Sequence, residues 1–542
     1  MSYFLLIFKD FGTILKTIGH SVRVVVVLFL LTFLLFSKPF KVATYNVENL
    51  FDAQYVGTEY DDYTKKHNWT KRMVETKLNH VAEVICDLDA DILGLQEIEN
   101  ANILEKLKKR LSRVGCGYRY SAITRKKDAT IQVALLSRFP IKKQKELQVS
   151  YASRVRNILE VDVDVEGEPL KLFVNHWKSR AYQGVESKRM KYAKTLKTRL
   201  QKLPKSKSYI ILGDFNTDYD AHLSLEKKLD DTNGKTGLHH VLGVEKNGHL
   251  VTEFDMLQHA DRYHYTLWKE LALQKRWNTK FYGKKGTADH ILLPRSMFDG
   301  KGIDYVNNSF GVFRKSYLFT KRGYINRWHY KKGKHRGKGY SDHLPIYAYF
   351  DTKPYHAGLD SVETKKVREV RNIEHLYTQE ALENEVILED VVVIWKYKRN
   401  AVIKQSTQGR GVFLFGCANA LEVGQKYDIL VSAIKSYKGL KEVTHAYSMA
   451  EKGEVDISPY MLKSSDFSKK ISYRQNEVIQ NLIGTVKKKY FYAQGRKIPI
   501  YFKKKKSTPP NGAKLKIHNA LLGYYKKLQL VVYSQKDFTV LE

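Results

Sequence analysis

The most constraining stretch of this chain is residues 209–218, where an apolar segment ends abruptly in polar side chains. Residues 209–212 are aromatic or branched and apolar, which is typical of a buried strand. Gly213 ends that run, and Asp214 and Asn216 follow on alternate positions. Because alternate residues of an extended segment point the same way, we expect these two side chains to project together. A carboxylate and an amide so placed can handle a water and a phosphoryl oxygen, although a simple turn uses the same residues.

Similar polar endings recur along the chain. Apolar, strand-like segments are expected at 41–50, 91–97, 131–140, 159–165, 170–174, 288–293 and 341–346. Helical patterns are expected between them at about 69–88, 100–113 and 186–203. The polar residues at or beside the strand ends are Asn46, Glu48, Glu97, His176, Asp289, Asp342 and His343. Enzymes whose active sites lie at sheet edges gather their catalytic groups in this way.

The length and the charge of the chain restrict its organisation and its partners. A chain of 542 residues exceeds one ordinary core, so two or three domains are expected. The formal net charge of +36 favours a polyanionic partner, either nucleic acid or an anionic membrane, over mere solubility. Cys86, Cys116 and Cys417 are too few for a disulfide framework and form no CxxC pair. We interpret all three as small buried apolar residues.

The N-terminal segment indicates export. Residues 24–36 read VVVVLFLLTFLLF and follow Lys9, Lys16 and Arg23. This run is shorter than the roughly 20 residues of a membrane span, and basic residues before a short apolar run are typical of a secretory signal. Residues 1–37 are therefore predicted to be a signal peptide or, if uncleaved, a membrane anchor, and a buried strand is the third alternative. The first two place the protein outside the cytoplasm, as a secreted, periplasmic or membrane-anchored protein.

Seven motifs occur in a fixed order between about residues 40 and 350. They are NVENLFD, LQEIE, VALLSRFP, VNHWKSR, GDFN, ADHI and SDHLPI. Together they resemble the deoxyribonuclease I-like superfamily of endonucleases, exonucleases and phosphatases. NVENLFD with NHWKSR looks most like the bacterial extracellular nucleases of that superfamily. The resemblance implies an α/β fold over residues 40–352, a four-layer sandwich of two facing mixed sheets.

The resemblance also implies roles for individual residues. The metal group would comprise Glu97 as the main ligand, Asn46 orienting it, and Glu48 and Asp342 as further acids. The catalytic group would comprise His176, Asp214, Asn216, Asp289 and His343. One departure concerns His176, because a glutamate that supports this histidine in relatives has no clear counterpart here. His290 and Trp177 are interpreted as structural residues.

These residue types suit the hydrolysis of a phosphodiester. A divalent ion held by hard oxygen ligands, Mg²⁺ or Mn²⁺ and also Ca²⁺, would neutralise the anionic substrate. Our hypothesis is that His343, paired with Asp289, activates a water together with Asp214. His176 would then protonate or stabilise the leaving group, and the roles of the two histidines could be exchanged.

A basic aromatic loop precedes the SDH motif. Residues 311–340 contain ten Lys or Arg, no acid and seven aromatic residues. Such a mixture suits phosphate contact and base stacking, although a solvated loop would have a similar composition. The residues predicted to bind nucleic acid, here and after His176, are Lys178, Arg180, Arg327, Trp328, Lys331 and Lys332.

The C-terminal third contains an internal repeat. Residues 353–384 are charged and are predicted to be a linker with some helix. At an offset of 88, residues 412–414 match 500–502, Gly424 matches Gly512, and Tyr437 matches Tyr525. The pattern resembles two small all-β barrels of the OB type, at 385–455 and 475–542, although β-domains that serve only packing would also fit. Residues 481–542 carry 14 basic residues and two acids, which favours nucleic-acid binding.

Taken together, the sequence predicts an exported, metal-dependent nuclease with accessory nucleic-acid-binding barrels. DNA is the favoured substrate, endonucleolytic cleavage the favoured action, and RNA remains an alternative. A phosphodiesterase of the same superfamily that acts on phospholipid or inositol phosphate is a second hypothesis. A catalytically inactive nucleic-acid-binding protein is a third.

Overall fold

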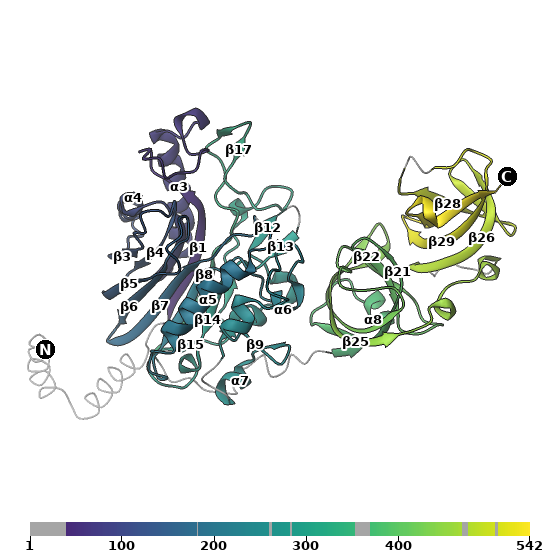
Figure 1. Ribbon diagram of the computed structural model, residues 1–542. Helices are drawn as coiled ribbons and strands as arrows, with labels where there is room; N and C mark the ends of the chain where they lie inside the picture. The colour runs from purple at the N-terminus through teal and green to yellow at the C-terminus, as the bar shows by residue number, and fades with distance from the viewer. Residues whose placement is uncertain are drawn as a thin grey trace, which may run out of the picture.

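The computed structural model describes residues 39–541 except 182, 259–262, 282–283, 353–368, 469–474 and 505–507. The predicted signal peptide or anchor at 1–37 lies outside the described residues. Within the described ranges, no helix combines the length and hydropathy needed to cross a membrane. Figure 1 shows a large α/β domain followed by two smaller β-domains.

Two six-strand paths face each other in the α/β domain. The first runs β15–β19–β1–β2–β4–β3 and has β16 paired to β19; the second runs β11–β14–β8–β7–β6–β5. The first sheet comprises β15 (Asp304–Tyr305), β19 (Ile346–Asp351), β1 (Phe40–Leu50), β2 (Ile92–Ile98), β4 (Gln132–Ser137), β3 (Tyr120–Ile123) and β16 (Gly311–Val312). The second comprises β11 (Tyr265–Thr266), β14 (Asp289–Leu293), β8 (Tyr209–Asp214), β7 (Glu168–His176), β6 (Ile158–Val165) and β5 (Ile141–Leu147). Three short hairpins are β9–β10 (Glu245–Lys246, His249–Leu250), β12–β13 (Thr279–Phe281, Lys284–Gly286) and β17–β18 (Tyr330–Lys331, Lys334–His335).

The helices of the α/β domain are α3 (Lys71–Leu88), α4 (Ala101–Arg113), α5 (Glu186–Leu200), α6 (Ala221–Ser224) and α7 (Glu253–Gln258). Helices α3, α4 and α5 cover the outer faces of the two sheets. Helix α3 begins at Thr70, whose side chain accepts a hydrogen bond from the Met73 amide, and it packs one apolar face against the first sheet. Helix α5 packs Tyr192 and Leu196 with residues of the second sheet. The predicted mixed α/β class is confirmed.

The register of the second sheet determines which side chains meet. β7 pairs with β8 in parallel and places His176 opposite Asp214, and β14 pairs with β8 antiparallel and places Asp289 opposite Asp214. Three polar residues from distant parts of the chain therefore lie side by side at one end of this sheet. The sheets can approach closely at Gly94, because a Cβ there would collide with Leu212 of the facing sheet.

The cysteine interpretation was wrong for two of the three residues. Cys86 at the end of α3 and Cys116 after α4 form a disulfide with a Cα–Cα separation of 5.5 Å. The physical reason is that α3 and α4 pack side by side, which brings residues 30 positions apart within bonding range. Cys417 is free and half-buried.

Each C-terminal β-domain is a five-stranded closed barrel with one added strand. In the first, β21–β22–β23–β25–β24 closes through the β21–β24 pairing, and β20 adds to β21; the second closes β26–β27–β28–β30–β29 in the same order, and β31 adds to β29. Barrel 1 contains β20 (Glu369–Arg371), α8 (Ile373–Thr378), β21 (Val386–Tyr397), β22 (Asn400–Lys404), β23 (Val412–Leu414), β24 (Gln425–Tyr437) and β25 (Leu440–Glu454). Barrel 2 contains β26 (Glu477–Lys487), β27 (Tyr490–Ala493), β28 (Arg496–Phe502), β29 (Lys514–Tyr524), β30 (Leu528–Val532) and β31 (Phe538–Leu541). Both are compatible with OB-type domains.

The predicted linker at 353–384 is too long. β20 pairs with β21, and Ile373 and Leu376 of α8 are buried in the core of barrel 1. These residues belong to the barrel because the open end of a barrel needs apolar side chains to cover its core. The charged residues around them made the segment resemble a linker. The two barrels also share an apolar cluster that includes Trp395 and Tyr533.

Candidate active site

Local backbone geometry explains the residues at the end of β8. Gly213 has φ +130°, and a Cβ there would collide with the backbone of Asn175 on the parallel neighbour. The strand ends at Asp214, and Asn216 lies beyond it in the left-handed region at φ 50°. Its amide N–H donates to Asp214 Oδ1 at 2.8 Å. Asp214 and Asn216 are thus joined by a turn rather than projecting from one extended strand, which corrects the sequence-based expectation.

Bulges in β1 and β2 present the acidic side chains of the facing sheet. The β2 register shifts between Gln96 and Ile98, and Glu97 within this bulge has φ 67°. Asn46 Nδ2 donates to Glu97 Oε1 at 3.0 Å and to Asp214 Oδ2 at 3.1 Å. Asn46 therefore ties a carboxylate of the first sheet to a carboxylate of the second. Such strained backbone at a polar cluster is typical of functional sites.

His343 is held by a carboxylate. Its Nδ1 lies 2.6 Å from Asp289 Oδ2, and Asn278 Nδ2 donates to the same oxygen. His343 Nε2 then faces Asp214 Oδ2 at 4.0 Å. Burial opposes the charged form, but the Asp289 carboxylate, with Asp214, outweighs burial and raises the pKa of His343 well above its usual range.

His176 is close to the same carboxylates but has no support of its own. Its Nε2 lies 3.6 Å from Asp214 Oδ2 and 3.8 Å from Glu97 Oε1. Within the described residues its Nδ1 is buried and has no hydrogen-bond partner. Burial lowers the pKa of His176 well below its usual range, and the positive charge of Arg156 lowers it further. Near the strand where relatives have the supporting glutamate, the chain has Asp128 and Gln132, but Asp128 pairs with Lys126 and Gln132 bonds to Thr124, so neither supports His176.

The carboxylates of the cluster are crowded in a buried space. Burial, reinforced by Asp342, raises the pKa of Glu97. Burial and the neighbouring Asp289 raise the pKa of Asp214 to about 7. These shifts express the cost of placing several carboxylates together in a low-dielectric site. Polar groups from six separate chain segments therefore converge on one acidic centre.

Comparison with known proteins identifies the family. The model of the Endonuclease/Exonuclease/phosphatase family matches residues 41–352, which is more than half of the chain. The chain belongs to this family. No curated protein sequence matches it.

Several solved structures are similar to the domain of this family. One is D. rerio TDP2 complexed with a single strand DNA product, at 17% identity and a TM-score of 0.37, covering 58% of this chain and 100% of that chain. Another is an endonuclease/exonuclease/phosphatase family protein from Leptotrichia buccalis, at 16% identity and a TM-score of 0.35, covering 58% and 99%. A third is the human Nocturnin catalytic domain with bound sulfate anion, at 15% identity and a TM-score of 0.34, covering 58% and 94%.

Enzymes of this family depend on divalent metal ions, and the side chains present here fit such an ion. Asp214, Asp289 and His343 bring ligand atoms within 4.8 Å of one another. Asp289 Oδ1 is buried and lacks a hydrogen-bond partner among the described residues, so it is available as a donor. Glu97 adds a carboxylate on the opposite sheet. Carboxylate oxygens without a thiolate are the donor set that Mg²⁺, Mn²⁺ and Ca²⁺ prefer.

Glu48, predicted for the metal group, and Arg327, predicted to bind nucleic acid, contact each other. Both oxygens of Glu48 accept hydrogen bonds from the 311–340 loop, Oε1 from the Arg327 guanidinium and Oε2 from the Trp328 amide at 3.0 Å. Glu48 is thus neutralised by Arg327, which also lies 3.6 Å from Asp342. Burial, with Asp342, still raises the pKa of Glu48 to about 7. Asp342 is the more open acid, with 33% of its side chain exposed.

Trp328 does not offer a stacking surface. It is 3% exposed, its Nε1 donates to His335 Nδ1 at 2.9 Å, and it packs edge-on against Trp69. The prediction that it binds nucleic acid was wrong, because the aromatic residues of a long loop are needed to build that loop's own core. Lys331 and Lys332 are exposed on the β17–β18 hairpin, as a phosphate-binding role requires.

The remaining predicted residues lie beside the centre. Arg180 binds the Asn216 carbonyl at 2.8 Å and forms an ion pair with Asp218. Asn216 Nδ2 contacts the Trp177 carbonyl at 3.3 Å, and Lys178 is half-buried nearby. Trp177 is fully buried, and His290 Nε2 lies 2.8 Å from the Thr217 carbonyl, so both residues are structural as expected.

Sequence reasoning missed three residues that support the site. Asn278 donates to Asp289, and Arg156 Nε donates to the His176 carbonyl at 2.9 Å. Lys77 is fully buried, and its Nζ donates to the Tyr340 carbonyl at 2.8 Å. Burial lowers the pKa of Lys77 to about 8, although Glu48 opposes this shift. Lys77 stands three residues after Val74 on the apolar face of α3, so helical spacing could have revealed its burial.

Proposed function

We propose that this protein is an exported, divalent-metal-dependent nuclease that hydrolyses phosphodiester bonds of DNA by endonucleolytic cleavage. The observation that carries the proposal is the junction between the two sheets, where Asn46 joins Glu97 to Asp214 and the two histidines face the same carboxylates. A buried acid–imidazole set of this kind suits phosphodiester hydrolysis, and the family membership supports it.

The orientation of His343 fits the activation of a water. Its Nδ1–H donates to Asp289, and in the neutral ring its Nε2 accepts the proton of a water near Asp214. Because the pKa of His343 is raised, the population of this neutral form grows as the pH rises. The water oxygen forms the new bond to phosphorus as the bond to the leaving oxygen breaks. The imidazolium that results is stabilised by Asp289, and Asp214 is fixed by Asn46 and Asn216.

The environment of His176 fits a hydrogen-bond donor. Its Nε2 lies between two carboxylate oxygens, so the ring carries its proton on that nitrogen. From this position it donates to a phosphoryl or leaving oxygen, and the leaving oxygen takes its proton from solvent. Glu97, with Asp342 at the open side, would hold Mg²⁺ or Mn²⁺, which leaves Asp214, Asp289 and His343 for the activation of the water. When bound, such an ion neutralises the phosphodiester and stabilises the charge of the transition state.

Three observations support a polymeric substrate and export. The net charge is +36, and the 311–340 loop presents exposed Tyr324 and Tyr330 among its lysines and arginines. The two barrels are compatible with OB-type domains, which commonly bind single strands. The Cys86–Cys116 disulfide suits an oxidising compartment outside the cytoplasm.

The decisive experiment incubates the purified full chain with supercoiled plasmid, labelled RNA and sphingomyelin, each with Mg²⁺, Mn²⁺ or EDTA. We expect metal-dependent nicking of the plasmid that EDTA abolishes and that His343→Ala reduces strongly. Cleavage of sphingomyelin alone would establish the phospholipid alternative, and cleavage in EDTA would overturn metal dependence.

A further inference from the structure

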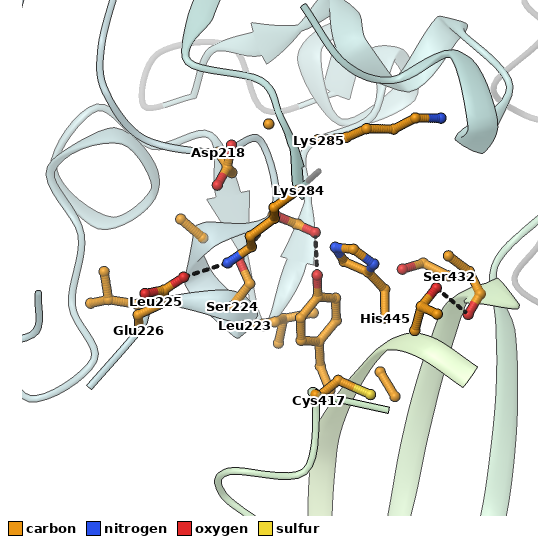
Figure 2. Close-up of a pocket in the computed structure, with 18 of the residues that line it drawn as sticks. Asp218, Leu223, Ser224, Leu225, Glu226, Lys284, Lys285, Cys417, Ser432 and His445 are labelled. Carbon is orange, nitrogen blue, oxygen red and sulfur yellow. Dashed lines mark hydrogen bonds and ion pairs between the residues drawn. The ribbon is translucent and has the colours of Figure 1, made fainter. Parts of the chain in front are cut away.

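A cavity of about 820 Å³ lies between the catalytic domain and barrel 1. Figure 2 shows Asp218, Lys284 and Lys285 on its catalytic-domain side and Ser432 and His445 on its barrel side. Asn216, two residues after Asp214 in sequence, and Arg180 also line it. The cavity therefore begins at the loop that carries the catalytic residues.

Two contacts between the domains fix the walls of the cavity to each other. Tyr447 of barrel 1 donates its hydroxyl to Asp220 Oδ2 of the catalytic domain at 2.7 Å. Arg276 lies 3.9 Å from Glu385 of the barrel. Because the side chains at these contacts come from both domains, the position of barrel 1 against the catalytic domain defines the shape of the cleft.

The hairpin β12–β13 connects this cleft to the active site. Thr279, its first residue, forms a β-bridge with His343, and the preceding Asn278 contacts Asp289. The same hairpin carries Lys280, Lys284 and Lys285 into the cleft. The β12–β13 hairpin thus begins beside His343 and ends with Lys284 and Lys285 in the lining of the cleft.

The lining is strongly cationic. It contains nine Lys or Arg against four Asp or Glu. Within the described residues, Lys280 and Lys285 have no carboxylate within ion-pair distance; their Nζ atoms contact the carbonyls of Gly323 and Gln274. Such cations are available to phosphates, because a backbone carbonyl does not neutralise them.

The barrel wall adds an aromatic surface. Phe415 lines the cleft with 47% of its surface exposed, and the Lys435 ammonium lies 4.4 Å from its ring centroid. Tyr437, 52% exposed, lies close to the same ammonium and to Tyr525 of barrel 2. Exposed rings alternating with cations are the usual platform for stacked bases.

We propose that this cleft binds a single-stranded polynucleotide segment that continues from the catalytic centre toward the barrels. Phosphates contact Lys280 and Lys285, and a base stacks on Phe415 beside Lys435, whose ammonium also pairs with Glu442 at 3.1 Å. The volume is in the range of sites that hold small-molecule ligands, which suits a few nucleotides of one strand and excludes a duplex. The proposal rests on the proposed nuclease function and specifies its substrate as a strand held by both domains.

The test measures binding separately from cleavage. Fluorescein-labelled oligothymidylates of about 4 and about 16 nucleotides, lengths that bracket the site size of one OB-type domain, are titrated in EDTA with fluorescence anisotropy. We expect the longer strand to bind more tightly to the natural chain. In the double variant Phe415→Ala/Lys435→Ala its affinity falls about tenfold, the effect of one lost stacking contact. In the same titration, Lys280→Ala lowers the salt slope by about 0.7 for its lost phosphate contact.

The matched control is Val423→Ala/Lys426→Ala, which removes an exposed apolar residue and a lysine from barrel 1 outside the cleft lining. We expect it to bind both oligonucleotides as the natural chain does, and Phe415→Tyr/Lys435→Arg to restore the length advantage. Unchanged affinity of the longer strand in Phe415→Ala/Lys435→Ala overturns the cleft proposal while plasmid nicking still upholds the nuclease. Loss of binding in the variant together with no metal-dependent cleavage by the natural chain retains the cleft and rejects the nuclease.

Discussion

The catalytic end of the two sheets and the tandem barrels use charge in opposite ways. At the catalytic end, Glu97, Asp214 and Asp289 are acids in a confined space, and Glu97 is held at a positive φ. In barrel 2, 14 basic residues and two acids are spread over residues 481–542. A site that works through individual atoms is destroyed by one substitution, whereas a surface that works through summed charge changes by small steps.

The barrels also contain a buried charge pair, and the contrast is instructive. Lys404 of barrel 1 and Glu477 of barrel 2 lie 2.9 Å apart with 2% of each side chain exposed. The Gly411 amide also contacts Glu477 Oε1 at 3.3 Å, and Lys404 contacts the carbonyls of Thr407 and Tyr460. This pair is satisfied and joins the barrels. The acids of the catalytic end, by contrast, are crowded so that burial and their neighbours raise the pKa of Glu97 and of Asp214, which is typical of a functional site rather than a structural one.

The largest effect should follow from the catalytic histidines. His343→Ala removes an imidazole held by Asp289, and we expect kcat on plasmid DNA to fall about 10³-fold. His176→Ala removes a donor without carboxylate support and should cost less, about 10²-fold. Nicking rates of both variants, with His518→Ala in barrel 2 as the control, measure the difference. Equal losses in the two variants would remove the asymmetry on which the proposed roles depend.

The next largest effect concerns the joint between the barrels. Lys404→Met leaves Glu477 buried without its partner and should destabilise the barrels by about 3–5 kcal/mol. Lys404→Met/Glu477→Leu removes both charges and should recover most of that loss. Hydrogen exchange of the β21 and β26 amides reports it locally. A double variant as unstable as the single one would mean that packing, and not the unpaired charge, causes the loss.

An acid-dependent effect is expected at Asp218 in the catalytic domain. Burial alone would raise its pKa, but Arg180, together with the Thr287 amide, outweighs burial and holds the pKa well below its usual range. A depressed pKa in the folded state contributes stability that is present above the unfolded-state value of about 4 and is lost as the pH falls below it. Asp218→Asn should therefore lower Tm at pH 7, and the gap to the natural chain should narrow in acid. A gap that stays constant down to about pH 3 would contradict this linkage, and the exposed Asp299→Asn serves as the control.

The sequence predicted which residues of the candidate site lie together better than it predicted their surroundings. GDFN, ADHI and SDHLPI place Asp214, Asp289 and His343 because a strand end fixes the position of the next polar residue. The contact between Glu48 and Arg327 joins residues 279 positions apart, so no local sequence pattern could predict it. Composition misled at Trp328, because an aromatic residue in a basic loop serves packing as readily as stacking. The cleft depends on how two domains meet, which no single segment encodes.

The smallest effect should come from the surface of barrel 2, and it is also the sharpest test of the contrast. Lys497 and Lys527 lie 5.4 and 5.7 Å from the centroid of the Tyr490 ring. Deleting the whole barrel would also remove Glu477 and leave Lys404 of barrel 1 without its partner. The substitution Lys497→Ala/Lys527→Ala is therefore the cleaner probe. If both lysines contact phosphates, the slope of log affinity against log salt should fall by about 1.4, because each contact with a single strand contributes about 0.7. Titrations of oligothymidylate in EDTA at several salt concentrations measure this slope, and Lys463→Ala/Lys536→Ala controls for net charge. A slope that falls equally in both double variants would mean that the barrels act through total charge alone, without a defined path for the strand.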